Sequence, residues 1–193
     1  MSQFPSVPAD RLTEQGWERI ERSTDTLARL PVVEVTGYTL VYGDCDFRER
    51  IATATGHDRP WRFFFATRLS LDPSPPGGGR TMLASLVRSR ARDGFVDRLR
   101  DRGFESIDRA GTDRVRVRTG ERAALTTYRA RAAVDDVSSP TMGHLAVWHH
   151  DGAFRVSGGA YPANDLSDVL DMDLDSDPNA YREELLDLIR DVA

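Results

Sequence analysis

The chain has 193 residues, of which 39% are hydrophobic and 30% charged, as is typical of a globular domain and not of a disordered or membrane-spanning chain. A net charge of -5 combines 26 arginines with 31 acidic residues, and the chain contains no lysine. This balance excludes a uniformly basic nucleic-acid coat. Folding at this length buries roughly 70% of the chain surface, so no disulfide or metal is needed for stability. We expect one domain over residues 1–193, with 1–8 as an irregular N-terminal arm.

Periodicity predicts the secondary-structure elements, although residues 17–27 show no regular spacing. In chain order the pattern indicates a helix (9–15), a strand (32–42), a segment that fits helix or strand (47–55), a strand (62–71), a loop (72–79), a helix (81–102), strands (104–108, 113–119, 122–134, 141–150 and 153–161) and a final helix (178–190).

The middle helix has the strongest pattern. Apolar residues recur every four positions from Leu83 to Leu99, and Gly103 follows as a C-terminal glycine. Pro178, directly after Asp177, opens the last helix. Strands joined by tight turns predict an antiparallel sheet, which helices must cover. The predicted fold class is therefore α+β, with about six to eight strands covered by one long middle helix and a C-terminal helix.

Two resemblances follow from these patterns. Arginine is less strongly hydrated than lysine. A chain rich in aspartate and without lysine resembles a cytoplasmic protein of salt-loving archaea, and this resemblance implies no particular function. GC-rich codon usage is an alternative cause of the same bias. The order of the elements resembles the PsbP/Mog1-type α-β-α sandwiches, which implies a fold and no activity. Because the sequence shows neither a secretory signal nor 18 uninterrupted apolar residues, we expect a cytoplasmic protein without membrane contact.

A hairpin with an Asp-Gly turn predicts a candidate ligand site. This turn sets a register in which Trp148 faces Arg155, an arrangement that permits a cation–π contact. His144 then faces Gly159, and Ser157 lies beside that glycine, so the surface is locally hollow. The hollow suits an anionic or aromatic ligand, or else a helix that packs onto the small residues. The candidate ligand-binding residues are His144, Trp148, Arg155 and Ser157.

Arginines gather on a second hairpin. If Gly120 and Glu121 form a two-residue turn, the apolar residues share one face of the hairpin. The opposite face then collects a candidate basic surface of Arg114, Arg116, Arg118, Arg129 and Arg131. A loop longer by one residue would move Arg129 and Arg131 to the other side.

Charge is strongly polarised along the chain. Residues 80–131 contain 14 arginines and 7 acids, a net of +7, whereas residues 135–193 contain 3 arginines and 13 acids, a net of -10. No aromatic residues alternate with the hairpin arginines to stack on bases, which argues against nucleic acid. We expect the acidic segment to pair internally with the arginine face.

The loop before the middle helix offers a weaker candidate site. Arg80 and Thr81 follow a PPGGG run at a helix N-terminus, where free N–H groups favour anions, but neither nucleotide-binding glycine pattern is present.

The candidate metal ligands do not form a site in the sequence. Adjacent His149 and His150 point to opposite faces of a strand, and residues 171–177 lack the glycine and glutamate of a calcium loop. The sequence therefore predicts no metal, no cofactor and no catalytic residue.

The leading hypothesis is a non-enzymatic binding or interaction domain, with a protein partner or a second copy of the chain among its candidate partners. One alternative is a small anionic-ligand-binding protein or enzyme that uses His144, Arg155 and Arg80. Another is weak nucleic-acid binding through residues 113–131. An enzyme would require a deep pocket in which His144 or His150 meets a carboxylate.

Overall fold

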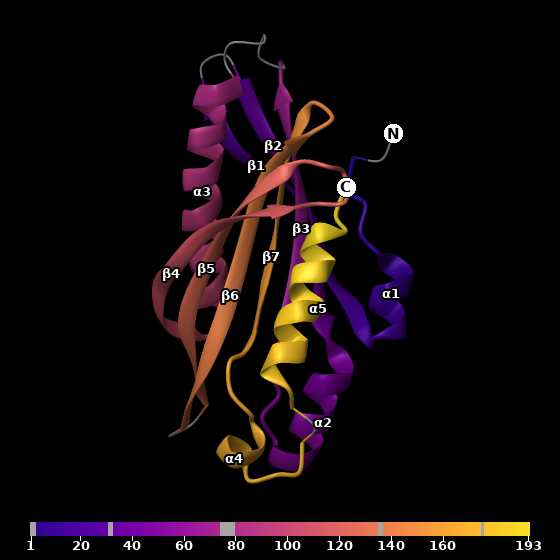
Figure 1. Cartoon of the computed structure of the whole chain (residues 1–193), viewed down its shortest axis with the longest axis vertical. Coiled ribbons are helices and arrows are strands. Elements are labelled where there is room, and N and C mark those ends of the chain that lie inside the picture. Colours follow the sequence, from indigo (N-terminus) through magenta and orange to yellow (C-terminus); the bar gives the residue numbers. More distant parts are fainter. Residues whose placement is uncertain (1–2, 31–32, 74–79, 135–136, 175) are drawn as a thin grey trace.

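The fold is built on one antiparallel sheet. The structure is a computed structural model that describes residues 3–30, 33–73, 80–134, 137–174 and 176–193. Within them, seven strands follow the order β1-β2-β3-β7-β6-β5-β4 (Figure 1). Their bounds are β1 (Trp17–Leu30), β2 (Val33–Asp44), β3 (Phe63–Asp72), β4 (Phe104–Arg116), β5 (Arg122–Val134), β6 (Val137–His150) and β7 (Ala153–Pro162). The predicted α+β class and antiparallel sheet are confirmed.

The connectivity places β3 and β7 at the centre of the sheet. The chain runs inward from the edge strand β1 through β2 to β3, and then crosses through α3 (Arg80–Asp101) to the opposite edge at β4. From β4 it returns through β5 and β6 to β7, which pairs with β3. Because α3 makes this crossover, it lies against one face of the sheet.

Local sequence explains where the other helices begin and end. They are α1 (Ala9–Glu14), α2 (Cys45–Thr55), α4 (Ser167–Leu170) and α5 (Pro178–Arg190). The Asp44 carboxylate caps α2 by accepting from the Phe47 N–H at 3.0 Å, and the left-handed Gly56 ends that helix. The Asp177 carboxylate caps α5 from the position before Pro178. The segment that fitted either helix or strand is thus a helix.

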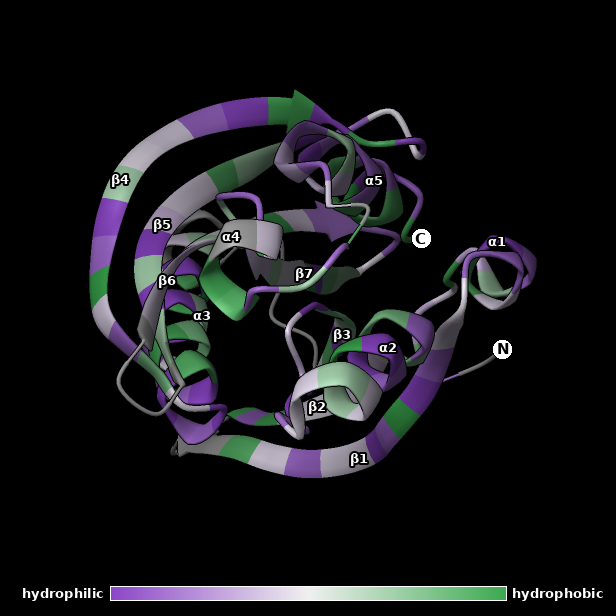
Figure 2. Ribbon diagram, turned by 90° about the horizontal axis from the view of Figure 1, so that it is seen from below, coloured by the Kyte–Doolittle hydropathy of each residue, from purple (hydrophilic) through white to green (hydrophobic). Residues whose placement is uncertain are grey.

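Two hydrophobic cores lie on the two faces of the sheet. Phe95 and Leu99 of α3 pack with Phe63 and Leu145 on one face, and α5 packs with α2 over the other face around Phe64. Figure 2 shows α3 on one side of the curved sheet and α5, α4 and α2 on the other side. The two chain ends meet beside α5, where the Ser6 N–H donates to the Ala193 carbonyl oxygen at 2.9 Å.

One segment without a prediction is now assigned, and two predictions about the elements need correction. Residues 17–27 belong to the edge strand β1, in which residues 18–22 and 24–27 are exposed, so no alternation of buried and exposed residues marks this strand. The two strands predicted within 104–119 form one strand, β4, which ends at Arg116. The predicted set of covering helices, one middle helix and a C-terminal helix, was incomplete, because α2 also packs on the sheet beside α5.

Candidate functional site

The β6–β7 hairpin has the predicted register, but its hollow is filled. Trp148 faces Arg155 and His144 faces Gly159 across the ladder. A side chain at Gly159 would lie 2.8 Å from the Leu185 Cδ1 atom of α5, so the helix packs into the space that glycine leaves. All four predicted ligand residues are therefore buried: His144, Trp148, Arg155 and Ser157. The structure supports helix packing, the alternative interpretation of this hollow.

His144 lies in this buried layer as a neutral imidazole. Its Nδ1 atom is 3.2 Å from the Thr127 hydroxyl and its Nε2 atom is 3.3 Å from the Tyr161 hydroxyl. Burial, and secondarily the charge of Arg182, lower the pKa of His144 to about 4. Burial also raises the pKa of Tyr161 to about 12. Both groups are therefore uncharged at neutral pH, and each can hydrogen-bond without charge.

Arg155 has unused hydrogen-bond donors in the same layer. Within the described residues, its Nε and Nη1 atoms and the Nε1 atom of Trp148 are buried without hydrogen-bond partners. Burial is the main cause that lowers the pKa of Arg155, and neighbouring Arg68 lowers it further. The Arg155 side chain belongs to a residue that is 6% exposed, so these donors are closed off from solvent.

Among the described residues, His150 and Glu121 form a histidine–carboxylate pair near the surface. The His150 Nδ1 atom lies 2.8 Å from the Glu121 carboxylate, and the two side chains are 29% and 35% exposed. The Thr119 hydroxyl and His150 lower the pKa of Glu121 to about 2. Neither residue lines the cavity beside the Asp44 end of α2 or the two cavities on the flanks of α3.

The predicted register of the arginine hairpin was wrong. Arg116, and not Thr119, faces Arg122, because the turn extends from Val117 to Glu121 and is closed by the Val117 N–H on the Glu121 carbonyl oxygen at 3.0 Å. This longer turn changes which residues share a face.

The predicted basic surface is therefore divided between the two faces of the sheet. Arg114 faces Ala124, which in turn faces Val147 on the α3 side. Arg129 faces Met142, which packs on the α5 side, and Arg131 follows two residues later on that same side. Arg118 lies beyond the end of β4.

Internal pairing with the acidic segment is correspondingly limited. Arg118 forms an ion pair with Asp191 at 2.7 Å. The acidic helix α5, however, packs on the face opposite α3, so it does not cover Arg114 or Arg116. The expectation of general internal pairing was therefore wrong for these two arginines. The other predicted anion contacts, Arg80 and Thr81, have side chains that lie outside the described residues.

A buried charge cluster, not found from sequence, ties the second face together. Arg62 forms ion pairs with Asp44 and Glu184, and we call these three residues the Arg62 cluster. The guanidinium carbon of Arg62 lies 4.1 Å from the ring centre of Tyr181 and 5.0 Å from that of Trp17. The cluster lines a wide cavity of about 760 Å³, but its charges already pair with one another, which suits a structural role.

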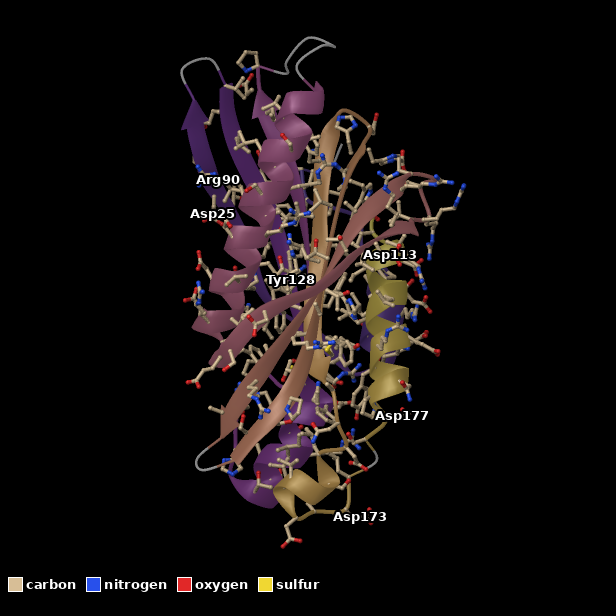
Figure 3. The ribbon with its side chains drawn as sticks, turned by 60° about the vertical axis from the view of Figure 1, so that its left-hand side comes forward. Asp25, Arg90, Asp113, Tyr128, Asp173 and Asp177 are labelled. Atoms are coloured by element: carbon tan, nitrogen blue, oxygen red, sulfur yellow. The ribbon has the colours of Figure 1, made fainter. Side chains whose placement is uncertain are left out.

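An apolar space lies between α3 and the strands β1 to β3. This apolar groove has a volume of about 560 Å³. Figure 3 shows Asp25 on β1 and Arg90 on α3 at the same edge of the molecule, where both line the groove. The apolar lining consists of Leu27, Val35, Phe65, Leu69, Leu71, Leu83, Leu86, Val87, Ala91, Phe95 and Val156.

Side-chain exposure and a polar floor distinguish the groove from ordinary core. Leu27 is 57% exposed and Leu86 is 41% exposed, although most side chains of their type are buried in this chain. Deep in the groove the hydroxyl groups of Thr39 and Thr67 lie 2.9 Å apart and are both buried. The groove therefore combines mainly apolar walls with a buried hydrogen-bonding pair, a combination that ligand pockets use for affinity and orientation, and charged residues also line it, namely Asp25, Arg90, Asp93, Asp97 and Arg98.

The described residues contain no group of three or more histidine, cysteine, aspartate or glutamate side chains that is arranged to hold a metal ion. The described helices include none with the length and apolar character needed to cross a membrane.

Comparison with known proteins places the chain in a family without assigning an activity. The model of one family, described as a domain of unknown function (DUF6517), matches residues 4–193. Neither the curated proteins nor the solved structures contain a match to this chain.

Proposed function

The protein belongs to the DUF6517 family, and we propose that it is a binding domain that holds a small apolar molecule in the apolar groove. The observation that carries this proposal is the concave apolar lining of about 560 Å³, with Leu27 and Leu86 left exposed on its walls. Exposed leucines on a concave surface lose contact with water when a ligand enters, and this contributes about 25 cal/mol for each Å² of apolar surface buried.

The shape of the groove favours a small molecule over a protein partner. Its walls come from a helix on one side and a sheet on the other, so an occupant is enclosed rather than laid on a flat patch. Its volume lies within the range of about 300–1,000 Å³ that is typical of small-molecule sites. The paired hydroxyls of Thr39 and Thr67 are placed to accept or donate one hydrogen bond and so to orient a single polar group of the ligand.

Binding of an uncharged apolar fluorophore, N-phenyl-1-naphthylamine, tests the proposal. We expect saturable fluorescence enhancement with the full chain, and at least about tenfold weaker binding when Leu27→Arg and Leu86→Arg place charges in the groove. Ile20→Arg is the matched control, because Ile20 is similarly exposed (45%) and also on β1 but does not line the groove. Absence of binding, or an equal loss in the Ile20→Arg protein, would refute the proposal.

We further propose a salt-rich cytoplasmic setting and a PsbP/Mog1-type architecture, which rest on lysine depletion and on the α-β-α layering respectively. A halophilic origin predicts that the midpoint of thermal unfolding rises as potassium chloride is added up to molar concentrations. A midpoint that is highest at low salt would oppose it.

A further inference from the structure

A second, smaller pocket lies on the other flank of α3. It has a volume of about 300 Å³ and is lined by residues of α3, β4, β5, β6 and β7. Its charged lining residues are all arginines, namely Arg88, Arg114 and Arg122 from three different elements. We call these three residues and their cavity the arginine pocket. His149 also lines it, with its ring edge-on to Phe154 at 5.1 Å between centres.

The arrangement brings like charges together without compensation. Arg116 faces Arg122 directly across the β4–β5 ladder, and Arg114 is next on the same face of β4. Facing like charges destabilise a strand pair, so this arrangement is unfavourable unless an anion is near. In the part of the chain that the structure describes, the side chains of Arg88, Arg114, Arg116 and Arg122 form no ion pair.

Arginines on the opposite face of β5 show a different environment. Arg129 faces Asp108 and Arg131 faces Glu105 across the same ladder. Carboxylates thus lie opposite the arginines on the α5 side, whereas the arginine pocket has no acidic residue in its described lining. The concentration of uncompensated positive charge is therefore local to the pocket, and is not a general property of an arginine-rich chain.

We propose that the arginine pocket binds the phosphate group of a small molecule. Guanidinium groups match the oxygens of phosphate through paired N–H donors. A phosphate group carries up to two negative charges on three free oxygens, whereas a carboxylate carries one charge on two oxygens. Three guanidinium groups therefore suit a phosphate better than a carboxylate. Val147 and Phe154 are buried and form an apolar part of the wall, which excludes water on that side and strengthens the attraction.

The proposal goes beyond the apolar groove and does not rest on it. Leu83 and Val87 of α3 line the groove, whereas Ala84 and Arg88 line the arginine pocket, so the two sites lie on different flanks of one helix. An uncharged fluorophore reports on the groove alone, and an inorganic anion reports on the arginine pocket alone. Failure of one proposal is therefore distinguishable from failure of the other.

Isothermal titration calorimetry of the full chain with inorganic pyrophosphate, at about 0.1 M salt, tests the proposal. We expect saturable binding that weakens at least about tenfold in Arg114→Gln and in Arg122→Gln. The matched controls are Arg129→Gln and Arg131→Gln, which remove the same charge from the opposite face of β5 and are expected to bind as the unchanged protein does. Arg114 and Arg122 are exposed, so their replacement leaves the core intact, as thermal unfolding of each variant will show.

Several results would overturn the proposal. Absence of pyrophosphate binding would refute the site, and equal weakening in the control variants would show only a general attraction of anions to a positively charged region. Equal affinity for citrate would oppose a phosphate site, and tighter binding of a single-stranded oligonucleotide that also weakens in Arg129→Gln would indicate an extended nucleic-acid surface. If a pocket variant fails to fold, the imidazole NMR signals of His149 in the unchanged protein must shift on pyrophosphate addition. Unshifted signals would contradict the site.

Discussion

Neutral His144 makes the stability of this fold depend on pH. Its imidazole is 3% exposed and hydrogen-bonded to the hydroxyls of Thr127 and Tyr161, so protonation would place a charge in a buried layer that also faces Arg182. The pKa of His144 falls from 6.5 in the unfolded chain to about 4 in the folded protein. Between these values the unfolded chain binds more protons than the folded protein, so stability falls as pH falls.

The size of this effect follows from the pKa difference. A shift of one pKa unit corresponds to about 1.4 kcal/mol, so His144 alone should lower the free energy of unfolding by about 3 kcal/mol between pH 7 and pH 4. His144→Gln keeps a donor and an acceptor for the two hydroxyls but does not titrate. The variant should therefore lack this part of the loss, while it shares the contributions of the acidic residues with the unchanged protein.

Urea unfolding of both proteins at several pH values between 7 and 4 measures the difference. The unchanged protein should lose about 3 kcal/mol more stability than His144→Gln over this range, because the variant lacks the buried imidazole of His144, whereas both proteins retain His57, His149 and His150. Parallel curves over this range would refute the reasoning and would mean that His144 becomes protonated within the fold at little cost.

Two further predictions concern the second face of the sheet. Gly159→Ala should lower the free energy of unfolding by about 1–3 kcal/mol, because the added carbon would lie 2.1 Å from the Phe63 carbonyl oxygen. Urea unfolding measures this loss, and an unchanged unfolding midpoint would contradict the close packing. Arg62→Met should cost about 3–5 kcal/mol, because it removes the buried guanidinium that pairs with buried Asp44 and half-buried Glu184. Adding Asp44→Asn and Glu184→Gln should recover much of that loss in the same assay, and no recovery would show that the ring contacts matter more than the charges.

Helix α3 has a central position in both proposals. As the crossover between the sheet centre and its far edge, it lies over one face without covering that face fully. The uncovered strips on its two flanks differ in character: the groove is mainly apolar with both acids and arginines among its lining residues, whereas the charged lining residues of the other strip are all arginines. A single crossover helix thus creates two distinct candidate binding sites.

The two hairpins show how far turn chemistry alone predicts register. The Asp-Gly turn gave the correct pairing of Trp148 with Arg155, because Asp151 and Gly152 both have the positive φ that this two-residue turn requires. The second hairpin also has a glycine with positive φ, Gly120, but it belongs to a longer turn that starts at Val117. A glycine indicates that a turn is present and leaves its length undetermined.

Sequence by itself determined the α+β class, most strands and the start of α5 after Asp177, because these depend on side chains within a few residues of one another. It also identified the surplus of arginines after residue 80. Only the tertiary structure decided which of them gather, because the face of each depends on a hairpin register and on the path of α3. The apolar groove was likewise beyond sequence, since its walls come from Leu27, Leu69 and Leu86, which lie far apart in the chain and meet only when the sheet and helix pack.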